Sequence, residues 1–122
     1  MYYLGIDLGG TNAAAGIVNE KYEIIAKASV PTNAKNGVDA IVENIAKAAR
    51  QAITEAKLTE NDIASIGIGS PGAIDPENGV VDFAGNLGFD HTPLAKLVGA
   101  YFPSKKILLE NDANVAAYAE HM

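Results

Sequence analysis

The stretch YYLGIDLGGTNAAAGIV, residues 2–18, determines the fold that this sequence predicts. Its apolar run at 2–6 stops at the glycine-rich segment DLGGTN, 7–12, and a second β-type run follows at 13–18. This pattern is typical of a strand, a glycine turn and a returning strand. The alternation at 22–30, ended by a proline, predicts a third strand. We therefore expect the chain to open with a three-stranded antiparallel meander.

The period of the apolar residues changes after this meander. Between Val38 and Ala56 they recur at steps of three and four, which predicts an amphipathic helix with Asn36 as a candidate N-cap. The apolar segment 63–69 follows after a short polar loop. Because a helical crossover separates this segment from the meander, we expect a strand at 63–69 that runs parallel to the first one.

Two further regions complete the predicted sheet and its cover. Residues 73–90 are expected to be irregular except for one hairpin flap, with Ala73–Ile74 and Val80–Phe83 as its arms. Pro93 suits the first turn of a short helix to Ala100, and a last strand is expected at 106–109. The predicted fold class is therefore α/β, a five-stranded mixed sheet with flanking helices, the long helix crossing one face.

The last residues predict a helix without a terminator. It begins at about Ala113, yet Val115–Met122 contains neither the glycine that usually stops a helix nor a proline beyond it. We therefore expect the natural protein to continue past Met122.

Composition limits the domain count and the classes of partner. A chain of 122 residues with 48% hydrophobic side chains suits one domain, 1–122. The net charge of −6 argues against nucleic acid and anionic lipid as partners. Cysteine is absent and histidine occurs twice, which excludes disulfides and leaves too few ligands for a structural zinc site. The N-terminus lacks a signal peptide pattern, so a cytoplasmic protein is expected.

The first motif with chemical meaning is Asp7-Leu8-Gly9-Gly10-Thr11-Asn12. Glycines lack a Cβ, so their main-chain N–H groups can approach phosphate oxygens, and the Thr11 hydroxyl adds a donor. Asp7 at the strand end can hold Mg²⁺, directly or through water. The alternative is a plain glycine hairpin with a turn-favouring aspartate.

Two more motifs follow predicted strands. After the strand at 63–69 comes Ser70-Pro71-Gly72, which is either an ordinary turn or a place where a substrate hydroxyl reaches the backbone. After the last strand comes Glu110-Asn111-Asp112-Ala113-Asn114. Asp112 is either a helix cap or a general base that accepts a proton from an attacking hydroxyl.

The three motifs share one position in the predicted topology. Ligands of open α/β sheets bind at the carboxyl edge of parallel strands, so Asp7, Gly72 and Asp112 are expected to face one crevice. Asn86 is either a sugar ligand or a turn residue. Phe89 is expected in the core, and His91 in an exposed loop.

With these motifs in this order, the chain resembles the ROK family of repressors, open reading frames and kinases, and its glucokinases in particular. The matching stretches are LGIDLGGTN at 4–12, IGIGSPG at 66–72, NLGF at 86–89 and LENDANVAA at 109–117.

The resemblance implies a ribonuclease-H-like lobe of the actin and hexokinase type, belonging to a kinase that closes around Mg-ATP and a hexose, with glucose as the expected sugar and its C6 hydroxyl as the acceptor. The residues that it assigns to the phosphates and Mg²⁺ are Asp7, Gly9, Gly10, Thr11 and Asn12. Those that it assigns to the sugar are Gly72, Asn86, Asn111 and Asp112, with Asp112 as the catalytic base.

The resemblance also implies what this chain lacks. The family's C-terminal lobe, with its zinc motif, would follow Met122, so the fragment alone is expected to be inactive and the full-length protein to be a homo-oligomer. Two other functions stay open: the sugar-sensing part of a ROK repressor and a non-catalytic binding lobe. A repressor would carry a DNA-binding segment before the first strand, and Met1 lies one residue from that strand.

Overall fold

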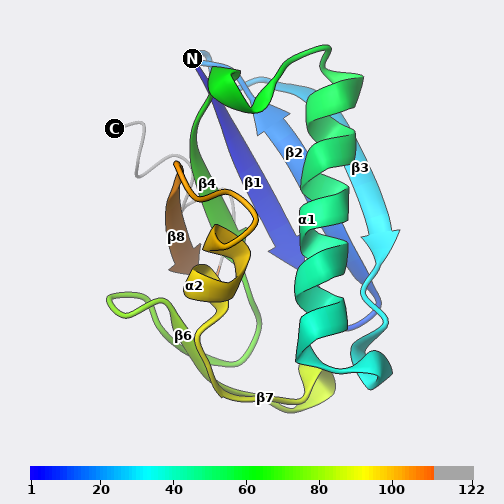
Figure 1. Cartoon of the computed structure of the whole chain (residues 1–122), viewed down its shortest axis with the longest axis vertical. Helices are drawn as coiled ribbons and strands as arrows, with labels where there is room; N and C mark the ends of the chain where they lie inside the picture. Colours follow the sequence, from blue (N-terminus) through cyan, green and yellow to red (C-terminus); the bar gives the residue numbers. More distant parts are fainter. Residues whose placement is uncertain (112–122) are drawn as a thin grey trace.

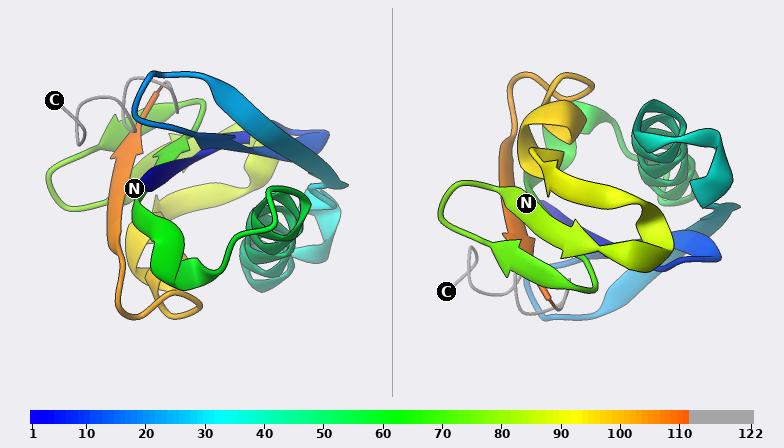
Figure 2. Two further views of the ribbon diagram at one scale, coloured as in Figure 1. Left: turned by 90° about the horizontal axis from the view of Figure 1, so that it is seen from above. Right: turned by 90° about the horizontal axis from the view of Figure 1, so that it is seen from below.

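The computed structural model describes residues 1–111 as one mixed five-stranded sheet, two helices against it and a small three-stranded sheet at one end. Both helices lie on the same side of the large sheet (Figure 1). The view from above separates this layer of helices from the layer of strands (Figure 2, left). The expected helix from about Ala113 lies outside the described residues.

The large sheet has the order β3-β2-β1-β4-β8. Its strands are β1 (Tyr2–Leu8), β2 (Asn12–Val18), β3 (Ile24–Pro31), β4 (Ile63–Gly69) and β8 (Lys106–Glu110). The first three strands pair antiparallel in chain order, whereas β4 pairs parallel with β1 and β8 pairs parallel with β4. The predicted meander and the two parallel additions are therefore confirmed.

The core lies between the sheet and the helices α1 (Val38–Glu55) and α2 (Leu94–Gly99). Alternate residues of β1, Leu4, Ile6 and Leu8, are at most 1% exposed, while Asp7 between them is exposed. This alternation follows from the period of two in a strand with one face on a helix. No helix among residues 1–111 is both long enough and apolar enough to cross a membrane.

The start of α1 differs from the prediction. Asn36 does not cap the helix, because it ends a 3-10 turn, η1 (Ala34–Asn36), and the N-cap is Gly37. Gly37 has φ 97° and makes no side-chain capping bond. The chain therefore enters the helix through a backbone conformation that glycine adopts without strain. The Asn36 side chain does not cap the helix.

The region 73–90 is more regular than expected. It holds β5 (Ala73–Asp75), β6 (Val80–Ala84), a 3-10 turn η3 (Gly85–Leu87) and β7 (Phe89–Thr92). The hairpin flap is confirmed, but β7 was not predicted, and His91 lies in this strand rather than in a loop. Its sequence, FDHT, lacks the run of β-type residues that marks a strand, and only pairing with β6 makes it one. Phe89 is in the core, 1% exposed, as expected.

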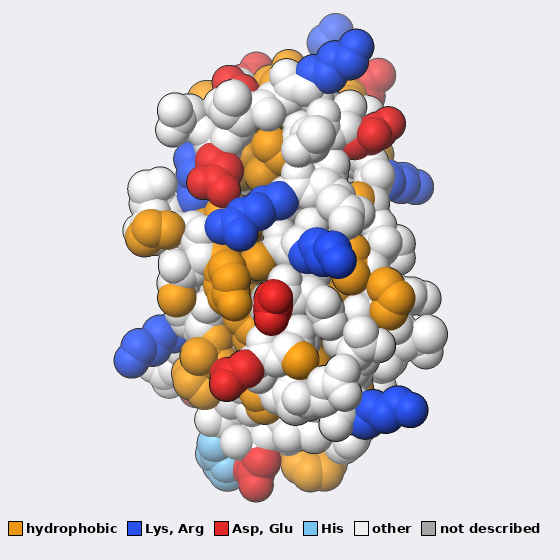
Figure 3. Space-filling model, turned by 45° about the vertical axis from the view of Figure 1, so that its right-hand side comes forward, with side chains coloured by type: hydrophobic (Ala, Val, Ile, Leu, Met, Phe, Trp, Pro, Cys, Tyr) orange, Lys and Arg blue, Asp and Glu red, His pale blue; other side chains and the backbone are white. Residues whose placement is uncertain are grey.

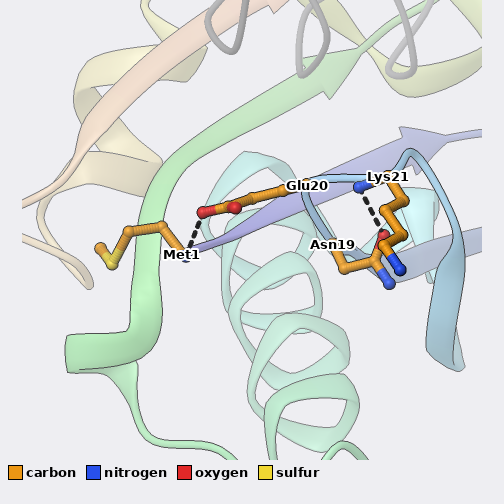
Figure 4. A network of polar contacts seen from close by, with 4 residues as sticks. All are labelled: Met1, Asn19, Glu20 and Lys21. Atoms are coloured by element: carbon orange, nitrogen blue, oxygen red, sulfur yellow. Dashed lines mark hydrogen bonds and ion pairs between the residues drawn. The ribbon is translucent and has the colours of Figure 1, made fainter.

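The turn between β2 and β3 lies at the opposite end of the molecule from β7. The Asn19 Oδ1 accepts hydrogen bonds from the Lys21 and Glu23 main-chain N–H groups, at 2.9 and 3.0 Å. The third strand was expected to begin at residue 22. Tyr22 has φ 64°, so it still belongs to the turn, and β3 begins at Ile24. The terminal ammonium of Met1 pairs with the Glu20 carboxylate at 2.7 Å, which ties β1 to this turn (Figure 4).

Arg50 joins the outer side of α1 to the chain after α2. Its Nη2 donates to the Tyr101 carbonyl oxygen at 3.2 Å, and its guanidinium lies 5.2 Å from the centre of the Phe102 ring.

Figure 3 shows Lys and Arg interspersed with Asp and Glu on the face that it presents, with hydrophobic side chains between them. That face therefore carries no large area of a single charge.

We predict that Ile45→Ala lowers the free energy of unfolding by about 2–5 kcal/mol, because it opens a cavity under α1. Ile45 is 0% exposed, whereas Ile24 is 47% exposed and serves as the matched control. Ile24→Ala should change stability by no more than about 0.5 kcal/mol. Urea unfolding of both variants tests this, and equal losses would place Ile45 outside the core.

Candidate functional site

The predicted motifs leave the sheet at one edge. In the pairing of β1, β4 and β8, Asp7 is opposite Gly69, and Gly69 is opposite Glu110. The loops that follow these three residues therefore start side by side. The small sheet formed by β5, β6 and β7 lies across the same end of the molecule, as the view from below shows (Figure 2, right).

The glycine turn between β1 and β2 is closed by its own backbone. The Gly9 N–H donates to the Asn12 carbonyl oxygen at 2.9 Å, so this N–H faces the turn and not a ligand. Neither Gly9 nor Gly10 has a left-handed φ. What favours glycine at position 9 is space, because an added Cβ would lie 3.3 Å from the Asn12 carbonyl oxygen.

Gly10 lies against Asn86. A Cβ on Gly10 would come within 2.9 Å of the Asn86 side-chain nitrogen. The predicted phosphate motif and one predicted sugar ligand are therefore neighbours in space, although they are far apart in the sequence. Asn86 lies in the 3-10 turn η3, so it is a turn residue. This position does not conflict with its predicted role as a sugar ligand.

Two residues that the sequence analysis did not single out support the glycine turn. Thr32, which follows β3, donates from its hydroxyl to the Gly9 carbonyl oxygen at 2.8 Å and from its main-chain N–H to the Thr11 carbonyl oxygen at 2.9 Å. The Asn44 side chain on α1 donates in turn to the Thr32 carbonyl oxygen at 3.0 Å. Thr32 follows Pro31 in a segment that reads as an ordinary strand end, so the sequence held no signal for this contact.

Gly72 has a structural reason to be glycine. Its φ is 91°, and an added Cβ would lie only 2.1 Å from the Phe83 carbonyl oxygen. Residue 72 therefore sets how closely the loop after β4 can pack on β6. Phe83 itself is 61% exposed at this edge.

Asn111 links the third motif to the second. Its Nδ2 donates to the carbonyl oxygens of Ser70 and Gly72, at 3.2 and 3.3 Å. The Ser70 N–H donates to the Glu110 carbonyl oxygen at 2.9 Å, which continues the pairing of β4 and β8 past the strand ends. Asp112, the predicted base, lies outside the described residues, so its expected place at this edge stays a prediction.

The residues present fit Mg²⁺ only as a partly hydrated ion. Within residues 1–111 no three His, Cys, Asp or Glu side chains gather as a metal site. Asp7 is a single exposed carboxylate at the end of β1. Mg²⁺ in nucleotide sites commonly keeps several waters and takes one or two carboxylates along with substrate phosphates, so one carboxylate here is sufficient.

Residues 3–122 match the model described as "ROK family", and the chain belongs to this family. It is 37% identical to the glucokinase of Thermotoga maritima, aligning 96% of this chain with 35% of that protein. A glucokinase structure from Streptomyces griseus, in complex with glucose and AMPPNP, superposes with a TM-score of 0.82 and 32% identity, over 99% of this chain and 36% of that one.

A putative xylose repressor from Caldicellulosiruptor is 31% identical over 96% of this chain and 29% of its own length. The chain thus spans about a third of the length of the curated relatives that it matches. The lobe has the actin and hexokinase type of fold that the resemblance implied.

We predict that Gly72→Ala lowers the free energy of unfolding by about 2–5 kcal/mol, from backbone strain and overlap with the Phe83 carbonyl together. Gly88→Ala is the matched control, because Gly88 has φ 68° but nothing within 4 Å of an added Cβ. Its expected loss is about 1–2 kcal/mol. Urea unfolding measures both, and equal losses would mean that the contact with β6 contributes nothing.

Proposed function

We propose that residues 1–122 are the N-terminal lobe of an ATP-dependent hexose kinase of the glucokinase kind. The observation that carries this proposal is the link from Asn111 to the Ser70 and Gly72 carbonyl oxygens. It joins two of the three motifs at the edge where the glycine turn also lies, so donor and acceptor of a phosphoryl group can meet there.

The nucleotide binds at the glycine turn. The Gly9 N–H is already bonded within the turn, so we assign the phosphate contacts to the backbone at Gly10 and Asn12 and to Thr11. Asp7 holds Mg²⁺, directly or through water. When bound, this ion neutralises charge on the phosphates.

The sugar binds between the loop after β4 and the flap. Asn111 uses its Nδ2 for the Ser70 and Gly72 carbonyls, so its Oδ1 is the atom that we assign to a sugar hydroxyl. Asn86 approaches the sugar from the side of Gly10, and Gly72 lines the pocket with backbone. Glucose is the expected hexose, since the glucokinases among the relatives are named for it.

Asp112 acts as general base in this proposal. As the C6 hydroxyl oxygen attacks the γ-phosphorus, its proton passes to the Asp112 carboxylate, the new oxygen–phosphorus bond forms and ADP leaves with the bridging oxygen. The transition state of phosphoryl transfer is loose, so positioning contributes more than base strength. A carboxylate held beside the hydroxyl is adequate for this step.

A sugar-sensing role remains the second candidate, because a repressor is among the relatives. The kinase is favoured since several glucokinases match at similar or higher identity. Phosphorylation of glucose by the full-length protein separates the two, because a sensor would bind the sugar without turning it over. A homo-oligomeric, cytoplasmic enzyme stays our prediction for the full-length protein.

We predict that Asp112→Asn in the full-length protein lowers kcat for glucose by about 10²–10⁴, the usual contribution of a positioned base. The KM for ATP should stay within about a factor of three, since the Asp112 carboxylate is not assigned to nucleotide binding. Asp39→Asn is the control, a surface aspartate in the first turn of α1 that should leave kcat unchanged. A coupled ADP assay measures each variant, and an unchanged kcat for Asp112→Asn would remove it as the base.

We further predict that residues 1–122 alone do not phosphorylate glucose. The curated glucokinases are about three times as long, and one lobe cannot hold sugar and γ-phosphate in line, a geometric contribution of about 7–11 kcal/mol to the barrier. The same ADP assay on the fragment, beside the full-length protein, tests this. Turnover by the fragment comparable to that of the full-length protein would show that the site is complete within 122 residues.

A further inference from the structure

Thr32 makes a contact with the glycine turn that the proposed reaction does not yet use. Its side chain is 0% exposed, and its hydroxyl donates to the Gly9 carbonyl oxygen at 2.8 Å. The packing of this position could be met by valine, which has the same shape. Valine would leave the Gly9 carbonyl oxygen without this hydrogen bond, so the hydroxyl contributes the bond and not the packing.

The peptide bond after Gly9 connects this hydrogen bond to the proposed phosphate site. In a trans peptide the C=O of one residue and the N–H of the next point in opposite directions. Since the Gly9 carbonyl points at buried Thr32, the Gly10 N–H points away from it. Gly10 is exposed, so this N–H faces the open side of the turn.

Two further hydrogen bonds hold the main chain of Thr32 in place. Its main-chain N–H donates to the Thr11 carbonyl oxygen at 2.9 Å, and its carbonyl oxygen accepts from the Asn44 side chain on α1 at 3.0 Å. Thr32 is thus hydrogen-bonded to the glycine turn at Gly9 and Thr11, and Asn44 bonds Thr32 to α1. This arrangement is stiffer than a glycine turn closed only by its own Gly9–Asn12 bond.

We propose that Thr32 is a positioning residue for the nucleotide, which fixes the Gly9–Gly10 peptide so that the Gly10 N–H is directed at a phosphate oxygen. Asn44 supports it from α1. This inference rests on the proposed function, because it takes the glycine turn as the phosphate site. The hydroxyl acts through the turn and does not touch the substrate.

The test uses the full-length protein and four variants: Thr32→Val, Thr32→Ser, Asn44→Asp and Thr92→Val. Valine keeps the shape and removes the hydroxyl, and serine restores it. Thr92 is the matched control, since it is 6% exposed and its hydroxyl accepts a hydrogen bond from the Asp90 N–H at 3.2 Å, a bond within β7 and not to the glycine turn. The measurements are the Kd of AMPPNP by calorimetry, the KM values for ATP and glucose, and Tm.

We expect Thr32→Val to raise the Kd of AMPPNP and the KM for ATP by about two- to tenfold, the range of one neutral hydrogen bond, with the KM for glucose unchanged. Thr32→Ser should restore most of the affinity. Thr92→Val should lower Tm by a similar amount without changing the Kd. Asn44→Asp, which removes the donor to the Thr32 carbonyl, should act in the same direction as Thr32→Val.

The outcomes separate this inference from the function on which it rests. If the unaltered protein binds AMPPNP and Thr32→Val binds it equally well, the positioning role is wrong and the kinase proposal stands. If Thr92→Val weakens binding as much as Thr32→Val, the effect is general stability and the positioning role is also wrong. If the unaltered protein binds no AMPPNP, the proposed function is wrong, and this inference with it.

Discussion

The parallel pairing of β1, β4 and β8 is the constraint on which the rest of the structure depends. Its register places Asp7, Gly69 and Glu110 in one row across the sheet. Parallel strands need long connections, and here these connections supply the helices that bury one face. The same pairing brings three loops to one edge, and the Asn111 side chain then links two of them through the main-chain carbonyl oxygens of Ser70 and Gly72.

Close approach of backbones explains the glycines at this edge better than conformational freedom does. Gly10 has no left-handed φ, and among residues 1–111 the nearest atoms to an added Cβ are those of the Asn86 side chain. Gly72 needs both an unusual φ and room for the Phe83 carbonyl. The loop after β4 and the flap therefore pack without a gap for a side chain, and this brings the flap, with Asn86, onto the glycine turn.

The regular elements could be predicted where the periodic pattern was long. The C-terminal end of α1 was predicted to within one residue, and both ends of β4 were predicted correctly. A long apolar pattern indicates that one face of an element, or both faces, are buried. β7 could not be predicted, since four residues of mixed polarity form a strand only through pairing with β6. The cap at Asn36 was wrong because a glycine conformation, which leaves no polar signature, begins the helix.

The sequence by itself determined the order of strands and helix, the positions of the three motifs at strand ends and the resemblance to the ROK family, because these follow from local periodicity and turn chemistry. Only the tertiary structure placed Asn86 against Gly10 and Thr32 behind Gly9, and showed that the Gly9 N–H is already bonded. The first two of these contacts join residues that are 76 and 23 positions apart in the sequence. Their distances depend on how the flap and the end of β3 pack on the turn, which no local pattern of residues encodes.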